Sequence, residues 1–164
     1  MKYTTMNSPV GPLTIAGDED GLCCILFGAG RRAAKPRPDW QKLDCDLLKE
    51  TVGQLQAYFA KRLTKFDLPL RLGGTPFQLR VWRELRRIPY GKVISYGDLA
   101  QRIDKPLASR AVGGATGSNP IPIVIPCHRV IGTGGSLTGY GGGLPIKQAL
   151  LELEGARISG NAVI

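Results

Sequence analysis

Hydrophobic and polar positions change their spacing along the first half of the chain. Residues 3–28 contain two apolar runs on either side of the polar turn GDEDG, which predicts a strand, a turn and a second strand. From Leu43 to Leu63 apolar residues recur at steps of three and four, which predicts an amphipathic helix. The segment FDLPLRL at 66–72 predicts a strand with its proline at a sheet edge, and the glycine pair at 73–74 marks a domain joint.

The second half of the chain has a mainly helical pattern. Thr75 followed by Pro76 is typical of a helix start. Ser95, with Asp98 three residues later, predicts a second capped start, and a third helix is expected from about Leu107, after the short turn DKP. Two short helices joined by a tight turn resemble a helix-turn-helix, whose second helix usually contacts DNA. The fold class is therefore α+β, with a small α/β domain at 1–72 and a mainly helical domain at 75–164.

The expected third helix contains an unusual run of small residues, AVGGATGSN. A glycine inside a helix costs about 1 kcal/mol relative to alanine, so Gly113 and Gly114 should weaken it. One interpretation is close packing against another helix. The other is a smooth face, including Ala111, whose backbone can approach a DNA groove. Arg110, directly before this run, is the one long charged side chain of the expected helix, and it is either a solvated residue or a DNA contact.

The charge is distributed unevenly along the chain. The formal net charge is +9, and Lys and Arg exceed Asp and Glu by two in residues 1–70 and by seven in residues 71–164. A basic second half favours a polyanionic partner, with nucleic acid first, although charge that only keeps the protein soluble would look the same. No stretch approaches the roughly 20 apolar residues of a membrane span. A soluble, cytoplasmic or nucleoid-associated protein is expected.

The four cysteines are Cys23, Cys24, Cys45 and Cys127, and without a sign of secretion they are expected to be free thiols. There is no C-x-x-C motif, and the single histidine cannot complete a zinc-finger type of site. Cys23 and Cys24 lie in a strand-like segment and are expected to be small core residues. Cys45 is expected at a helix start. No metal and no cofactor are predicted.

The candidate chemistry lies in the sequence PCHR, where Cys127 directly precedes His128, the only histidine. A cysteine attacks as its thiolate, and an imidazole can accept its proton directly or through a water molecule. Adjacent side chains on an extended strand point to opposite faces, so the pair needs either a bend between them or a bridging water. A histidine base also needs a group that orients it, usually a carboxylate. Glu152 and Glu154 on the last expected helix face different ways, and spacing alone does not choose between them.

A glycine-rich segment follows, GTGGSLTGYGGG at 132–143, with seven glycines around Tyr140. It lacks the spacing of a phosphate-binding loop. It is either a flexible surface loop or a pocket wall on which backbone atoms come close to a flat ligand.

Two long segments resemble the signature of the O6-alkylguanine-DNA alkyltransferases, which are also called methylated-DNA–protein-cysteine methyltransferases. The segments are RAVGGATGSNPIPIVIPCHRVIG and TGYGGGLPIKQALLELEG. The same family signature also includes the segments VISYGDLA and TPFQLRVWRELRRIPYG. The resemblance is therefore dense over residues 75–155. It is looser in the first 70 residues, where it rests on SPVGPLTI. It implies a ribonuclease-H-like first domain and a winged-helix or helix-turn-helix-like second domain.

The resemblance also implies a role for individual residues. Cys127 would be the alkyl acceptor, His128 would activate it through a water molecule, and Glu154 would orient His128. Asn119 would brace the site, and Tyr96 would support nucleotide rotation and give a proton to the leaving guanine. Arg110 would fill the gap left by the flipped base, beside DNA contacts from Ala111, Gly113, Gly114 and Tyr96. The base would lie against Pro122, Val130, Tyr140, Gly141 and Gly142, with Val130 acting through its carbonyl.

The implied reaction has clear physical consequences. A base inside a duplex must be flipped out, at a cost of a few kcal/mol that is smaller for a mispaired lesion. The free cysteine is not regenerated from the thioether product, so each chain would react once. A monomer is expected, and cooperative binding along DNA is left open. Gly141 stands where relatives often have a side-chain donor, and Gly142 and Gly143 leave a small pocket wall. We therefore expect alkyl groups larger than methyl to be accepted.

Three other hypotheses compete with the alkyltransferase, which is favoured over all of them. A non-catalytic lesion sensor of the same superfamily would commonly have tryptophan in place of the cysteine, so Cys127 argues directly against it. A Cys-His hydrolase would need an oxyanion hole and many turnovers. A basic helix-turn-helix regulator would leave PCHR and the glycine-rich segment unexplained. Residues 156–164 carry no motif and could be a loose tail.

Overall fold

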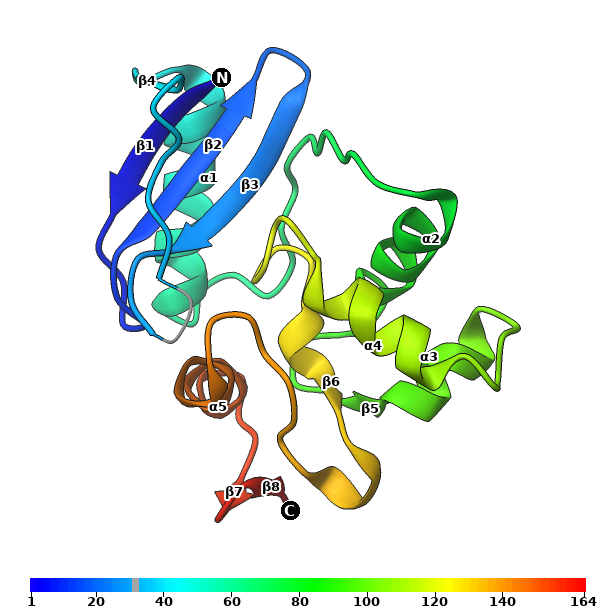
Figure 1. The fold of residues 1–164 in the computed structure, drawn as a ribbon. Coiled ribbons are helices and arrows are strands. Elements are labelled where there is room, and N and C mark those ends of the chain that lie inside the picture. Colours follow the sequence, from blue (N-terminus) through cyan, green and yellow to red (C-terminus); the bar gives the residue numbers. More distant parts are fainter. Residues whose placement is uncertain (31–32) are drawn as a thin grey trace.

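The structure is a computed structural model that describes residues 1–30 and 33–164. The first part of the chain forms a small sheet covered by one helix (Figure 1). The sheet contains β1 (Lys2–Met6), β2 (Leu13–Asp18), β3 (Gly21–Phe27) and β4 (Gln41–Lys42) in the order β3-β2-β1-β4. β1, β2 and β3 are antiparallel, and β4 is parallel to β1. The predicted strand-turn-strand is therefore present as β2 and β3, with β1 as an additional strand.

Helix α1 (Asp46–Phe59) packs against this sheet and is shorter than the pattern from Leu43 to Leu63 predicts. It begins after Cys45, whose extended backbone (φ −150°, ψ 168°) makes it the N-cap. It ends before Lys61, which has a positive φ of 60° that an α-helix cannot accommodate. Cys45 thus lies at a helix start, as expected.

The predicted strand at 66–72 is wrong. This segment touches the sheet at a single bridge between Leu70 and Leu22, where Leu22 N–H donates to the Pro69 carbonyl and Arg71 N–H donates to the Leu22 carbonyl. Pro69 has no N–H of its own, so the ladder cannot continue along the segment.

The second part contains α2 (Pro76–Leu85), β5 (Ile94–Ser95), α3 (Tyr96–Arg102), α4 (Ser109–Gly117) and α5 (Leu144–Leu153). Both predicted helix starts carry complete capping boxes, Thr75 with Gln78 and Ser95 with Asp98. The third helix begins at Ser109, two residues later than expected, and Leu107 is fully exposed in the turn before it. Helices α3 and α4 pack on each other and on α2 as the helix-turn-helix pattern predicts (Figure 1).

Residues 156–164 do not form a loose tail. They contain β7 (Ile158–Ser159) and β8 (Ala162–Val163), an antiparallel hairpin whose Ile158 and Val163 pack on a small apolar cluster of Ile131, Leu137 and Leu151. Leu137 N–H donates to the Asn161 carbonyl at 2.6 Å, which ties the hairpin to the glycine-rich segment.

One continuous core joins the sheet, α1 and the helices of the second part. Trp82 of α2 lies in this core, and its indole N–H donates to the Ala115 carbonyl of α4 at 2.8 Å. That bond fixes α4, and with it the start of the following segment, against the body of the protein. Within the described ranges, no helix is long and apolar enough to cross a membrane.

Candidate active site

Cys127, His128 and Arg129 form a single turn of 3-10 helix, η1, directly after Pro126. Of the two alternatives left by the sequence, a bend between Cys127 and His128 or a bridging water, the bend is present, and all three side chains are buried. The chain reverses its direction just before this turn, and Ile125 N–H donates a 2.9 Å hydrogen bond to the Ile121 carbonyl across the reversal. After the turn, β6 (Val130–Ile131) pairs in parallel with β5 and returns the chain to the helical part.

A buried network is centred on the carboxylate of Glu154, the C-cap of α5. Its Oε2 accepts hydrogen bonds from His128 Nε2 at 2.8 Å and from Arg129 Nη2 at 3.0 Å, and its Oε1 accepts from Arg129 Nε at 2.8 Å. Arg129 also donates to the Ile88 carbonyl. Glu152, the other candidate, is exposed and accepts a hydrogen bond from Gln148. Of the two carboxylates on this helix, the structure brings Glu154 to the histidine.

The hydrogen bond to Glu154 determines which nitrogen of His128 carries its proton. Although burial alone would raise the pKa of Glu154, the hydrogen bonds and charges of His128 and Arg129 lower it to about 2, so the carboxylate is ionised and can only accept. Burial lowers the pKa of His128, so the ring is neutral with its proton on Nε2. Its Nδ1 is then a bare acceptor that is buried and has no hydrogen-bond partner among the residues that the structure describes. A neutral imidazole with one unsatisfied lone pair is a base held ready for a proton.

The Cys127 thiol is 7% exposed, and this burial raises its pKa. This rise of the pKa is opposed, in decreasing order of size, by Asn119, by the charge of Lys147 and by Tyr140. Asn119 is itself held firmly, because its amide donates to the Ile125 carbonyl at 2.8 Å and its oxygen accepts from Ile121 N–H. The resting cysteine is thus a protonated thiol that needs a base before it can attack.

Lys147 on α5 is a site residue that sequence reasoning missed. Its side chain is fully buried, and its ammonium donates to the carbonyls of Val130 and Thr138 at 2.6 and 2.9 Å. The ammonium also lies 6.0 Å from the ring centroid of Tyr96. A lysine one turn before two buried leucines on an otherwise apolar helix face was the signal that could have found it.

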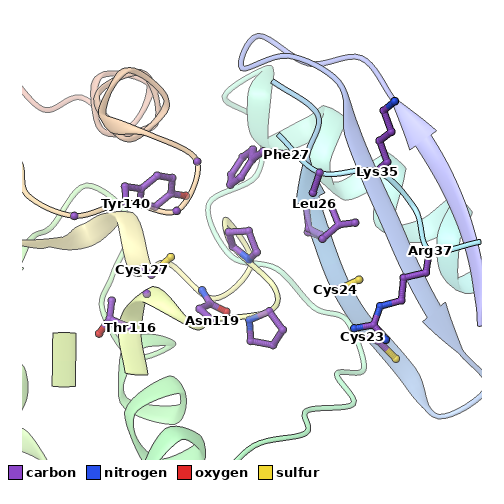
Figure 2. Close-up of a pocket in the computed structure, with 18 of the residues that line it drawn as sticks. Cys23, Cys24, Leu26, Phe27, Lys35, Arg37, Thr116, Asn119, Cys127 and Tyr140 are labelled. Carbon is purple, nitrogen blue, oxygen red and sulfur yellow. The ribbon is translucent and has the colours of Figure 1, made fainter. Parts of the chain in front are cut away.

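Cys127 lines a cavity of about 550 Å³, whose other lining residues come from both parts of the chain. Figure 2 shows Cys127 and Asn119 on one side and β3 on the other, with Phe27 and Tyr140 facing each other at one end. The residues expected around a base are in the lining, namely Pro122, Tyr140, Gly141 and Gly142, whereas Val130 is not among the described lining residues. The glycine-rich segment is thus a pocket wall.

Cys23 and Cys24 also line this cavity, so the expectation that they are core residues is wrong. Ala16 of β2 pairs with Cys24, but Gly17 pairs with Leu22, which leaves Cys23 as an extra residue in a bulge. A bulge turns two consecutive side chains toward the same side of a strand. Burial raises the pKa of Cys24 to about 11, so it stays a thiol. In the described part of the chain, no cluster of three or more His, Cys, Asp or Glu side chains is placed to hold a metal ion.

The remaining predicted residues lie outside this cavity, on the helix-turn-helix. Tyr96 begins α3 and its hydroxyl donates to the Thr138 carbonyl at 3.3 Å. Arg110, Ala111 and Gly114 share the exposed side of α4, with Gly113 half-buried near Tyr96. A Cβ added to Gly114 would meet no atom of the described chain within 4 Å, so close packing does not explain that glycine.

Comparison with known proteins matches both parts of the chain. The family model for the ribonuclease-like domain of 6-O-methylguanine DNA methyltransferase covers residues 1–72, and the model for the DNA-binding domain covers residues 76–156. The chain belongs to the 6-O-methylguanine DNA methyltransferase family. Its α+β fold, a ribonuclease-like domain followed by a DNA-binding domain, is the one that the sequence predicts.

Relatives in this family match over nearly their whole length. The methylated-DNA–protein-cysteine methyltransferase of Methanosarcina acetivorans is 47% identical, over 95% of this chain and 99% of its own. The protein of the same name from Mycobacterium tuberculosis is 51% identical, over 94% and 93%. The crystal structure of M. tuberculosis OGT in complex with DNA matches with a TM-score of 0.86 and 51% identity, covering 94% of this chain and 93% of that one.

Proposed function

We propose that this protein repairs DNA by flipping O6-alkylguanine out of the duplex and transferring the alkyl group, once and irreversibly, to its own Cys127. The chain is a methylated-DNA–protein-cysteine methyltransferase by family. The observation that carries the residue assignment is the buried Cys127 at a cavity wall, next in sequence to a histidine whose Nδ1 is an unpaired acceptor. O4-alkylthymine is a second candidate lesion.

The proposed reaction begins with proton transfer. His128 Nδ1 takes the thiol proton of Cys127 through a bridging water, and Glu154 stabilises the imidazolium through Nε2. The thiolate attacks the alkyl carbon, the carbon–oxygen bond breaks, and the guanine leaves with the bonding electrons. Tyr96 donates a proton to the leaving guanine, and Asn119 holds the segment that carries the cysteine. The product is a thioether, for which the site has no reverse reaction.

The proposed DNA contact is the exposed side of α4. Gly114 lies there without any packing need for a glycine, at a cost of about 1 kcal/mol to the helix, which fits a backbone that must come close to a groove. Arg110, exposed on the same side, is the candidate to fill the gap left by the flipped base. DNA binding is also supported by the M. tuberculosis relative, which is described in complex with DNA.

We further propose that residues 1–72 and 75–164 are the two domains, with the reacting groups in the second. The protein is expected to act as a monomer on duplex DNA, and any cooperativity would come from neighbouring copies on the same strand.

The direct test is the intact mass after mixing with excess duplex DNA that contains one O6-methylguanine. A gain of one methyl group, mapped to Cys127 and saturating at one per chain, is the expected result. An unchanged mass with the lesion bound but intact would instead support the non-catalytic sensor. Turnover beyond one group per chain would support a hydrolase.

The size of the accepted alkyl group has a separate test. Because Gly141 and Gly142 line the cavity without side chains, we expect transfer of a benzyl group from O6-benzylguanine to Cys127. Failure of that transfer, in protein that accepts methyl from duplex DNA, would show that the cavity does not admit large groups.

A further inference from the structure

One side chain of the first domain is hydrogen-bonded to the buried network that holds His128. Tyr58 lies on α1, 96 residues before Glu154, and its hydroxyl donates a 2.6 Å hydrogen bond to Glu154 Oε2. That oxygen is the same atom that accepts from His128 Nε2 at 2.8 Å. A residue of the ribonuclease-like domain is therefore bonded to the carboxylate that holds the histidine.

The direction of this hydroxyl is set by packing. The ring of Tyr58 is fully buried, and its centroid lies 5.3 Å from that of Phe59, 5.4 Å from that of Phe66 and 6.3 Å from that of Tyr90. A ring enclosed in this way has little rotational freedom, so the hydroxyl is held toward the carboxylate. Burial and the charge of Glu154 both raise the pKa of Tyr58, which keeps it a donor at any working pH.

The hydrogen bond ties Glu154 to an element that Arg129 does not belong to. Arg129 belongs to the same turn as His128, so its two bonds to Glu154 tie the carboxylate to that turn. Tyr58 comes from a different element and completes the set of donors on Oε2. With this donor present, the carboxylate is less able to rotate or to draw the proton of the imidazolium toward itself.

We propose that Tyr58 is a positioning residue for alkyl transfer, which fixes Glu154 and through it the orientation and basicity of His128, so that the first domain completes the site. This rests on the proposed function, because it assumes that His128 activates Cys127.

The test compares Tyr58→Phe with Tyr90→Phe as a matched control. Tyr90 packs against the same ring, but its hydroxyl donates to the Leu153 carbonyl at 3.4 Å instead of to the carboxylate. Both variants keep their rings. The measurement is single-turnover methyl transfer from O6-methylguanine duplex, in which the rate constant reports the site and the methyl groups gained per chain report the folded fraction.

For Tyr58→Phe we expect a roughly ten-fold smaller rate constant at neutral pH, the size of effect for a lost hydrogen bond to a charged group. With one donor fewer on Oε2, Glu154 becomes a stronger acceptor for His128, the pKa of the imidazole rises, and the acidic limb of the rate profile moves to higher pH. Tyr90→Phe should keep the wild-type rate and profile, and both variants should bind the duplex as tightly as the wild type.

Each outcome has a defined meaning. A Tyr58→Phe variant with the wild-type rate constant and pH profile would overturn the proposal and leave Tyr58 as a packing residue. A lower number of methyl groups per chain at an unchanged rate constant would also overturn it, since that is a folding effect. If the wild-type protein itself gains no methyl group, the proposed function fails, and that result is separate from the comparison of variants.

Discussion

The ammonium of Lys147 donates a 2.6 Å hydrogen bond to the Val130 carbonyl, so α5 is tied to the strand that directly follows the reactive turn. Its second bond, to the Thr138 carbonyl, ties the same lysine to the glycine-rich segment. One buried cation thereby joins the strand after Cys127 to the wall of the pocket, and its charge opposes the burial that raises the pKa of that cysteine.

Replacing this cation should slow the reaction in a pH-dependent way. Burial lowers the pKa of Lys147 to about 8, so its charge is present below that pH and is lost as the pH rises through it. Lys147→Met should therefore transfer alkyl groups more slowly at pH 7, by roughly ten-fold if one charged interaction is lost, and the deficit should shrink above pH 8. Rates from pH 6 to 9.5 test this, with exposed Lys92→Met as the control. A deficit that stays constant over this range would mean that the lysine acts through packing alone.

Removing the charge of Glu154 should destabilise the fold as well as stop transfer. Glu154→Gln leaves the guanidinium of Arg129, whose side chain is 7% exposed, without its counter-charge, and breaking a buried pair costs about 3–5 kcal/mol. Urea unfolding and methyl transfer are the measurements. Glu152→Gln on the exposed side of α5 is the control and should change stability by less than about 0.5 kcal/mol. Similar unfolding midpoints for the two variants would contradict this account.

The same carboxylate predicts how stability depends on acid. Its folded-state pKa of about 2 lies below the ordinary value of 4.5. The stability that it contributes is therefore complete above about pH 5 and is lost as the pH falls from 4.5 toward 2. In Glu154→Gln this part of the acid dependence should be missing. An identical loss of stability in both proteins across that range would assign it to other groups.

Gly114 offers a test of the DNA surface that leaves the active site intact. A Cβ at Gly114 would meet no atom of the described residues within 4 Å, and Gly114→Leu removes a helix glycine, so stability should rise by up to about 1 kcal/mol. Duplex binding and repair should nevertheless fall strongly, while reaction with free O6-benzylguanine stays unchanged. Gly53→Leu is the matched control, since Gly53 is also an exposed helical glycine without neighbours within 4 Å, but on α1. Normal duplex repair by Gly114→Leu would remove this face of α4 from the DNA contact.

The C-terminal hairpin should control the order of the pocket wall. A Cβ on Gly135 would lie 2.6 Å from the Val163 carbonyl, which shows how closely the hairpin approaches the glycine-rich segment. Removing residues 158–164 exposes Leu137 and Leu151 and frees the segment that carries Tyr140. We expect a folded protein with slower transfer and faster amide hydrogen exchange at 132–143. The control is Ile164→Ala, which keeps the hydrogen bond from Ile164 N–H to the Arg157 carbonyl, changes a residue that is 77% exposed and should have no effect. Unchanged exchange at 132–143 in the shorter chain would contradict the coupling.

Local hydrogen bonds explain which elements could be predicted from the sequence. The two capping boxes, at Thr75 and Ser95, involve residues three apart, so their geometry is complete within one turn of helix. The strand expected at 66–72 depends instead on a distant partner, β3, and a proline without an N–H limits that pairing to one bridge. The bulge at Cys23 likewise depends on the register of β2 against β3, which no local pattern encodes.

The sequence by itself determined the chemistry that is available: one histidine beside one cysteine, a basic second half, a helix-turn-helix and a glycine-rich segment with one tyrosine. Only the tertiary structure decided which groups act together. Spacing left Glu152 and Glu154 equivalent and the family resemblance pointed to Glu154, but the packing of α5 is what buries Glu154 and leaves Glu152 in water. Tyr58 was an ordinary member of an apolar helix face until α1 placed its hydroxyl on Glu154. Side-chain contacts between residues 96 apart depend on how whole elements pack, and periodicity reports only which face of an element is buried.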